Sequence, residues 1–143
     1  MIAGQYQHQV DYKGRVSVPK KFRLSLVSGG VVTRGLDGCL FLYSRSTWDE
    51  LAKKLAKLPL TGKDARAFSR YLFGSAAEVS FDRLGRILIP SYLLQFAKIS
   101  SDVTFVGVGD RIEIWSQPTW NSYQEVTEKE SAQVAEKLTE SGI

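Results

Sequence analysis

The sequence DYKGRVSVP at residues 11–19 determines the fold, because it returns as DRLGRILIP at residues 82–90. Both copies read Asp-x-x-Gly-Arg, then an alternating apolar run, then Pro, and each shared residue lies 71 positions after its counterpart. A match at one fixed offset is typical of an internal duplication. We therefore interpret residues 1–72 and 73–143 as two related halves.

Each copy begins with residues that favour a tight turn. The Asp side chain can accept a bond from the backbone two residues later, and Gly in the fourth position tolerates a positive φ angle. We predict hairpin turns at residues 11–14 and 82–85, each followed by a half-buried strand and then by a helix that begins after the Pro. Arg15 and Arg86 would then project from equivalent places at the rim of a sheet.

The remaining elements follow the same order in both halves. The first half is predicted to contain strands at 5–10, 31–33 and 39–43, a helix at about 48–58 opened by a Thr47–Glu50 capping box, and a helix at about 64–72. The second half is predicted to contain strands at 78–81, 103–108 and 112–115 and a helix from about Thr119 past Glu128, followed by a charged tail that frays. Each half is too small to bury a good core alone. We therefore predict an α+β fold, mainly β, in which the halves fuse into one pseudo-symmetric β unit flanked by helices.

Composition limits the class of protein. The chain has 143 residues and 43% hydrophobic residues, which is ordinary for a globular protein. No run approaches the roughly 18 apolar residues of a membrane span, and the first residues do not resemble a signal peptide. Cys39 is the single cysteine, which excludes an internal disulfide and fits a reducing cytoplasm, and His8 is the single histidine. We expect Cys39 to be an inert buried thiol, and we expect no metal site and no cofactor.

The charge is distributed unevenly along the chain. The formal net charge is +4, with +8 on residues 1–75 and −4 on residues 76–143. A basic half favours a polyanionic partner, of which nucleic acid is the commonest. The alternative is that these charges only solvate the surface.

The doubled Asp-x-x-x-Arg motif resembles the MraZ family, which is built from two tandem AbrB-like halves of the swapped-hairpin (SpoVT-AbrB) type. The similarity covers nearly the whole chain, and VGVGDRIEIW at residues 106–115 looks like part of that family's second half. The resemblance implies a bacterial transcriptional regulator that binds repeated elements in its own promoter, at the head of the division and cell-wall gene cluster. It also implies ring-shaped homo-oligomers, double-stranded DNA as the partner, and a cytoplasmic location at the nucleoid.

In that family the Asp-Arg motif marks the edge that contacts DNA. The resemblance therefore assigns DNA contact to Arg15 and Arg86, whose guanidinium forks suit guanine or phosphate. The positions expected to form the turns and orient the arginines are Asp11, Gly14, Asp82 and Gly85. Other basic residues near the two turns suit phosphate contact, namely Lys13, Lys20, Lys21, Arg23 and Arg83. The alternatives are that each Arg only pairs with its own Asp and stiffens the turn, and that the other cations only aid solubility.

Two other interpretations compete with a DNA-binding regulator. An enzyme would need a nucleophile with a base, a carboxylate pair or a metal set, and the sequence offers little of this material. Asp11 and Asp82 each have an Arg neighbour that keeps them ionised, which is a poor state for acid catalysis. We therefore predict no enzyme and no small-molecule substrate. The stronger competitor is a self-associating structural module with only non-specific nucleic-acid affinity, because exposed strand edges pair readily with copies of themselves.

The two tryptophans at equivalent positions, Trp48 and Trp120, are expected to pack in the core or between the halves rather than to stack on bases. A second basic group is expected to face solvent or a neighbouring subunit, and it consists of Lys53, Lys54, Lys57, Arg66 and Arg70.

Overall fold

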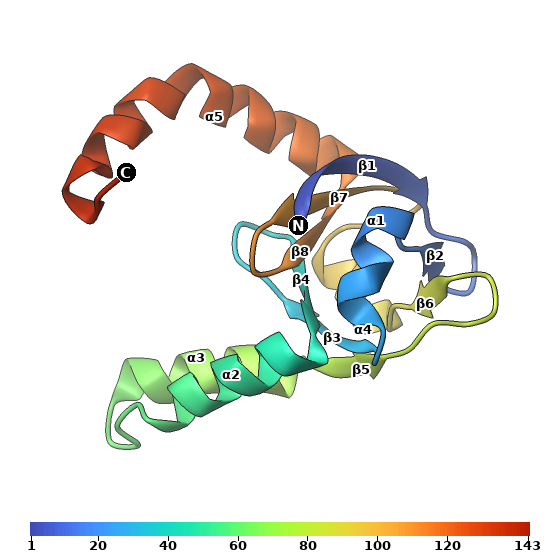
Figure 1. The fold of residues 1–143 in the computed structure, drawn as a ribbon, viewed down its shortest axis with the longest axis horizontal. Coiled ribbons are helices and arrows are strands. Elements are labelled where there is room, and N and C mark those ends of the chain that lie inside the picture. The colour runs from blue at the N-terminus through green and yellow to red at the C-terminus, as the bar shows by residue number, and fades with distance from the viewer.

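The computed structural model describes residues 1–143 and contains two antiparallel sheets flanked by helices (Figure 1). The strands are β1 (Ala3–Gln9), β2 (Arg15–Ser17), β3 (Gly30–Arg34), β4 (Leu40–Ser44), β5 (Ala77–Val79), β6 (Arg86–Leu88), β7 (Asp102–Val108) and β8 (Ile112–Ser116). The helices are α1 (Lys20–Arg23), α2 (Arg45–Ala56), α3 (Lys63–Gly74), α4 (Ser91–Phe96) and α5 (Gln117–Lys137), with 3-10 turns at Leu24–Leu26 and Thr139–Ser141. The predicted α+β class is confirmed.

The order of strands shows that the two halves exchange elements. The larger sheet runs β1-β7-β8-β4-β3-β5, and β2 and β6 form a separate two-stranded sheet. Strand β1 of the first half pairs with β7 of the second, and β5 of the second half pairs with β3 of the first. The counterparts in the two halves are β1 and β5, β3 and β7, and β4 and β8. Exchanging each strand for its counterpart gives the same order, read from the other end of the sheet. The halves are therefore interleaved, with β4 and β8 paired at the centre.

The predicted hairpins are right for the turns and wrong for the strand pairing. The turns close locally, since the Gly14 N–H donates to Asp11 O at 3.0 Å and the Gly85 N–H donates to Asp82 O at 3.1 Å. The strand before each turn pairs with the other half, however, and β2 pairs with β6. This arrangement buries the apolar centres of the two motif strands, Val16 and Ile87, in one shared core.

The main core lies between the larger sheet and the layer made by β2, β6, α1 and α4, and it draws on both halves. Phe22 of α1 and Leu93 of α4 are equivalent positions, and both are fully buried there. On the opposite face of the sheet a smaller cluster contains Phe41, Tyr43 and Trp115. Neighbouring strand residues point to opposite faces, which explains how one strand supplies both clusters.

The long helices after β4 and β8 begin earlier than the sequence suggests. The Ser44 hydroxyl accepts from the Thr47 N–H at 3.2 Å, and the Ser116 hydroxyl accepts from the Thr119 N–H at 3.2 Å. The predicted Thr47–Glu50 capping box is therefore wrong, because each strand runs directly into its helix and its last serine becomes the N-cap. Helix α5 likewise begins before Thr119.

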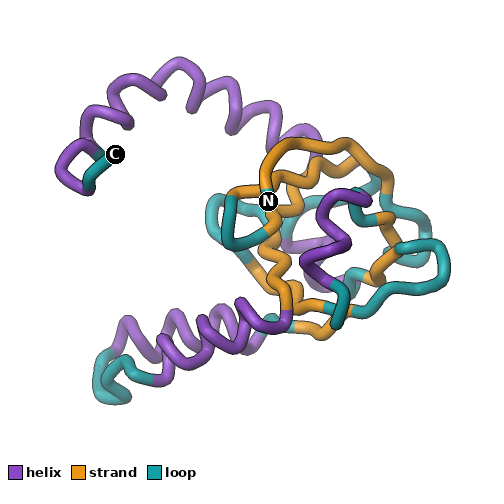
Figure 2. Tube along the Cα trace, viewed as in Figure 1, coloured by secondary structure: helices purple, strands orange, loops and turns teal.

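Two helical arms extend from the body of the molecule (Figures 1 and 2). One is the antiparallel pair α2 and α3, and the other is α5, which continues to Lys137 where a frayed tail was predicted. Trp48 packs on Phe73 at the base of the first arm, with ring centroids 5.2 Å apart, and Trp120 packs on Trp115, with centroids 5.1 Å apart. The predicted packing role of both tryptophans is thus confirmed. None of the helices combines the length and hydrophobicity needed to cross a bilayer.

Candidate nucleic-acid interface

The pairing of β2 with β6 brings the two motif copies to the same edge of the molecule. In the register of this pair Ser17 lies opposite Arg86, and Arg15 lies opposite Leu88. The segment after β6 is also hydrogen-bonded to the turn of the first copy, because the Ile89 N–H donates to Gly14 O at 2.9 Å. Residues 71 positions apart in the sequence therefore form one local structure.

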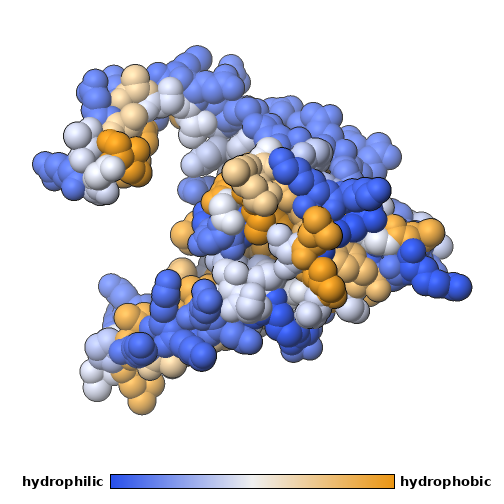
Figure 3. Space-filling model, in the orientation of Figure 1, coloured by the Kyte–Doolittle hydropathy of each residue, from blue (hydrophilic) through white to orange (hydrophobic).

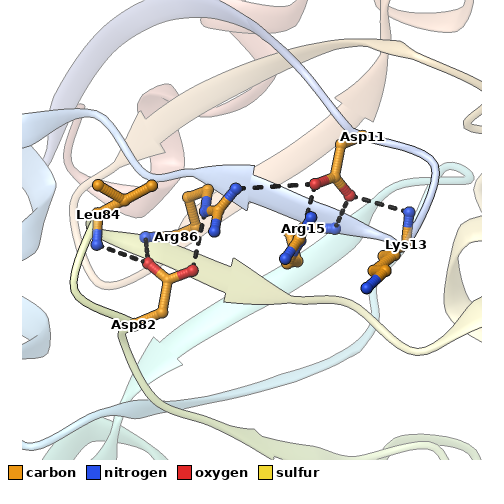
Figure 4. A network of polar contacts seen from close by, with 6 residues as sticks. All are labelled: Asp11, Lys13, Arg15, Asp82, Leu84 and Arg86. Carbon is orange, nitrogen blue, oxygen red and sulfur yellow. Dashed lines mark hydrogen bonds and ion pairs between the residues drawn. The ribbon is translucent and has the colours of Figure 1, made fainter.

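In the first copy, the two oxygens of Asp11 have separate tasks (Figure 4). Oδ1 accepts from the backbone N–H groups of Lys13 and Arg15, both at 2.9 Å, which closes the turn. Oδ2 accepts from Nε of Arg15 at 2.7 Å. One carboxylate thus fixes the backbone of the turn and the direction of the arginine that follows it.

The second copy repeats these bonds almost unchanged. Oδ1 of Asp82 accepts from the backbone N–H groups of Leu84 and Arg86, both at 2.9 Å, and Oδ2 accepts from Nε of Arg86 at 2.8 Å. The copies differ in one ion pair, because Nη1 of Arg86 also lies 3.8 Å from Oδ2 of Asp11 (Figure 4). Arg15 makes no corresponding pair with Asp82.

Both aspartates are held in the ionised form. The pKa of Asp11 is lowered mainly by the bond from the Arg15 backbone N–H, and the pKa of Asp82 is lowered mainly by the bond from the Arg86 backbone N–H. Neither carboxyl is therefore placed to act as a proton donor near neutral pH. Their partners stay reachable, since 31% of the Arg15 side chain and 26% of the Arg86 side chain are exposed.

The glycine of each turn lies next to a side chain from the other half of the chain. A Cβ added at Gly14 would lie 3.4 Å from Leu94 of α4, whereas a Cβ added at Gly85 would overlap the guanidinium of Arg23 on α1. Nε of Arg23 donates to Val18 O at 2.8 Å. The predicted phosphate contact of Arg23 stays a prediction, and in the structure this side chain contacts Val18 O and lies beside Gly85 of the second turn.

Three arginines line one open groove beside the second turn. Arg15, Arg83 and Arg86 share it with Asp82 and Leu84. At this end of the molecule Figure 3 shows hydrophilic and hydrophobic residues side by side. Four of the predicted site residues are exposed and form no ion pair in the structure, namely Lys13, Lys20, Lys21 and Arg83.

The sequence did not reveal the contacts that cross between the halves. The pair between Asp11 and Arg86, and the position of Arg23 behind Gly85, both depend on the strand exchange. The duplication and the resemblance to swapped-hairpin proteins are the two signals that could have suggested such cross-contacts. Cys39 is buried, and burial raises the pKa of its thiol. The structure has no group of three His, Cys, Asp or Glu residues arranged to hold a metal ion.

Comparison with known proteins gives consistent matches over the whole chain. The family model described as "MraZ protein, putative antitoxin-like" matches twice, over residues 1–71 and 72–141. A protein of Caldanaerobacter subterraneus subsp. tengcongensis named transcriptional regulator MraZ is 50% identical over 138 residues, which is 96% of each chain. Proteins of the same name from Thermoanaerobacter pseudethanolicus and Clostridium tetani are 49% and 47% identical over 143 residues, the full length of both chains in each case.

Proposed function

Since this chain belongs to the MraZ family, we propose that it is a bacterial transcriptional regulator that binds repeated DNA elements in its own promoter, at the head of the division and cell-wall gene cluster. Its place of action would be the cytoplasm, at the nucleoid. The role is one of binding, with double-stranded DNA as the partner and no small-molecule substrate.

The observation that carries this proposal is the pair of arginines presented by two equivalent turns. Arg15 and Arg86 each give only Nε to the aspartate of their own turn, so terminal nitrogens remain for a ligand. Arginine suits this task because its planar fork can donate two parallel bonds to a guanine edge or to a phosphate. A purely structural ion pair would not need both copies to line an open groove.

The exposed cations around the groove support the same interpretation. Lys13 and Arg83 lie within the two turns, and Lys20 and Lys21 lie on α1. Phosphate contacts of this kind position a protein on the duplex without reading its sequence. We therefore propose a division of labour in which the paired arginines read bases and the surrounding cations bind the backbone.

The test is fluorescence anisotropy with a labelled duplex from upstream of the protein's own gene, against a duplex of shuffled sequence, over a series of salt concentrations. We expect tighter binding to the upstream duplex near physiological salt. Arg15→Ala should remove this difference while the fold stays intact. Lys20→Ala should weaken binding to both duplexes and reduce the slope of log Kd against log salt by about one.

Lys53→Ala is the matched control, because Lys53 is an exposed cation on α2, outside the motif groove. It should leave both affinities close to wild type. Equal binding to the two duplexes that disappears with salt would favour the alternative, a self-associating module with only non-specific nucleic-acid affinity. Unchanged affinity and specificity of Arg15→Ala would remove the turn from the reading role.

We further propose that copies of the chain assemble into a ring. The two arms support this, since every residue of α5 from Glu128 onward is exposed and the α2–α3 tip exposes Leu60 at 83%. Exposed apolar residues on projecting arms are typical of contact surfaces. A ring would present many copies of the groove, so weak contacts could add along repeated elements through effective concentration. Sedimentation velocity of wild type and Leu60→Asp tests this, and a wild-type monomer at all concentrations would refute it.

A further inference from the structure

One oxygen atom lies close to both motif arginines. Oδ2 of Asp11 accepts from Nε of Arg15 at 2.7 Å and lies 3.8 Å from Nη1 of Arg86. The two guanidinium groups therefore converge on a single carboxylate, although they come from opposite halves. Figure 4 shows Arg86 extending from its own turn toward Asp11.

This convergence has an electrostatic consequence. Two guanidinium groups so close together repel each other, and a carboxylate between them offsets that repulsion. Asp82 does not perform this task, because it pairs with Arg86 alone. The two aspartates occupy equivalent positions of the motif, yet Asp11 holds two arginines and Asp82 holds one.

We propose that the two motif copies form one composite reading site, in which Asp11 holds Arg15 and Arg86 side by side so that they contact neighbouring base pairs. The alternative is two independent reading heads that contact separate parts of the operator. This inference rests on the proposed function, since it presupposes that the groove binds DNA. Neighbouring base pairs are separated by about 3.4 Å along the duplex, a spacing that suits two groups gathered around one oxygen.

The composite site predicts that the DNA contact of Arg86 depends on Arg15, whereas the DNA contact of Arg15 does not depend on Arg86. Removing Arg15 leaves Oδ2 of Asp11 without its closest partner, and Nη1 of Arg86 is the nearest cation to replace it. Loss of Arg15 should therefore also withdraw Arg86 from the DNA. Loss of Arg86 leaves the bond between Arg15 and Asp11 in place. Arg15 is thus the dominant reading residue, and Asp11 is the positioning residue for both arginines.

A double-mutant cycle with the full chain tests this. The probe is the labelled duplex from upstream of the gene, and the variants are Arg15→Ala, Arg86→Ala and the double variant. We expect Arg15→Ala to weaken specific binding by about 10- to 100-fold, the range for loss of a bidentate base contact. The double variant should bind within about 3-fold of Arg15→Ala, whereas independent contacts would give the product of the two single effects.

The asparagine variants of the two aspartates separate positioning from turn formation. Asn keeps an oxygen that can close the turn, but it loses the charge that holds the arginine. Asp11→Asn should therefore weaken specific binding by about 10-fold or more, close to Arg15→Ala, whereas Asp82→Asn should resemble Arg86→Ala. Cooperative unfolding in urea, with similar midpoints for the two variants, would show that the turns still form.

Substitution of single base pairs in the probe locates the contacts. A base pair that an arginine contacts is one whose substitution no longer changes the affinity of the variant that lacks this arginine. Under the composite site, the base pairs identified in this way with Arg15→Ala and with Arg86→Ala are the same or adjacent. Effects that multiply, or contacts more than one base step apart, would overturn the composite site and leave the regulator intact. If neither arginine variant changes specific binding, the proposed function fails together with this inference.

Discussion

The turn at residues 11–14 and the turn at residues 82–85 have the same backbone and different surroundings. Each closes through a bond from Gly to Asp, at 3.0 and 3.1 Å, and each Asp directs the arginine that follows. Behind the first turn lies the apolar side chain of Leu94, and behind the second lies the guanidinium of Arg23. The motif residues fix the turn, whereas the character of each turn is set by a residue from the other half.

The same comparison applies to charge. Asp11 is shared between the arginines of both copies, whereas Asp82 serves its own copy only. The motif residues that form these bonds are identical, so the difference arises where the halves meet. A duplicated motif can therefore acquire unequal roles without any change in its defining residues.

The strongest test of the comparison concerns the shared core. Phe22→Ala and Leu93→Ala remove equivalent buried side chains, one from each half, that lie in a single cluster. We expect losses of unfolding free energy of about 3–5 kcal/mol for Phe22→Ala and about 2–5 kcal/mol for Leu93→Ala. Both variants should unfold in one urea transition by circular dichroism and by tryptophan fluorescence. Tyr12→Ala is the control, because Tyr12 is 89% exposed and should shift stability by only about 0.5 kcal/mol. Two separate transitions would mean that the halves fold independently.

The glycines of the two turns should differ in their tolerance of a side chain. Both have positive φ angles, +88° at Gly14 and +75° at Gly85, so alanine costs about 1–2 kcal/mol at either position. At Gly14 the added Cβ would also lie 2.8 Å from the carbonyl oxygen of Ile89, which is backbone and cannot move aside. At Gly85 the obstacle is the flexible end of Arg23. Gly14→Ala should therefore destabilise by about 2–4 kcal/mol in urea and Gly85→Ala by about 1–2 kcal/mol.

The double variant Gly85→Ala with Arg23→Ala provides the check on this reasoning. Its loss of unfolding free energy should be close to the sum of the two single losses, because the flexible guanidinium already moves aside in Gly85→Ala. Equal losses for the two single glycine variants would show that the backbone angle alone determines the cost.

The sequence predicted the parts of this structure that depend on local chemistry. The Asp and Gly positions gave both turns, the alternating apolar residues gave most strands, and the fixed offset gave the pseudo-symmetry. The exchange of β1 and β5 between halves was expected only from the resemblance to swapped-hairpin proteins and not from the turns, because a turn does not specify which strand its neighbours pair with. The cap at Ser44 was missed because a serine that ends a strand is not distinguished, from sequence alone, from one within it.

The candidate site shows the same division. The local structure of each turn could be predicted, since the bonds that close it and orient its arginine join residues at most four positions apart. The contact between Asp11 and Arg86 could not, since it exists only after the strand exchange has placed β2 beside β6. Long-range charge pairs of this kind depend on topology, which the motif does not encode.

The pH dependence of folding should be equal for the two turns. Both aspartates have a lowered pKa in the folded chain, mainly because a backbone N–H donates to each. Their stabilisation is present above the unfolded pKa of about 3.9 and is lost as pH falls below it, through the folded pKa. Asp11→Asn and Asp82→Asn should each flatten this loss in acid-series urea titrations, and by similar amounts. A clear difference between them would mean that Arg86 contributes to the titration of Asp11.

The smallest expected effect comes from making the second turn resemble the first. Arg23→Leu places at α1 the residue type that Leu94 supplies at α4, so contact with Gly85 is kept while the bond from Nε to Val18 O is lost. One such bond contributes about 1 kcal/mol, and we expect a loss of this size in urea denaturation. Leu94→Met is the control, because it changes shape within an apolar site and leaves every hydrogen bond in place.

Arg23→Leu also tests whether the guanidinium of Arg23 contacts a DNA phosphate. Its guanidinium lies behind the second turn and donates to the backbone, so Arg23→Leu should leave the slope of log Kd against log salt unchanged. A phosphate contact would instead reduce that slope by about one, as expected for Lys20→Ala. An unchanged slope with a lower urea midpoint would assign Arg23 to the support of the second turn. A reduced slope would mean that the guanidinium leaves Gly85 when DNA binds, and the two turns would then differ in mobility as well as in charge.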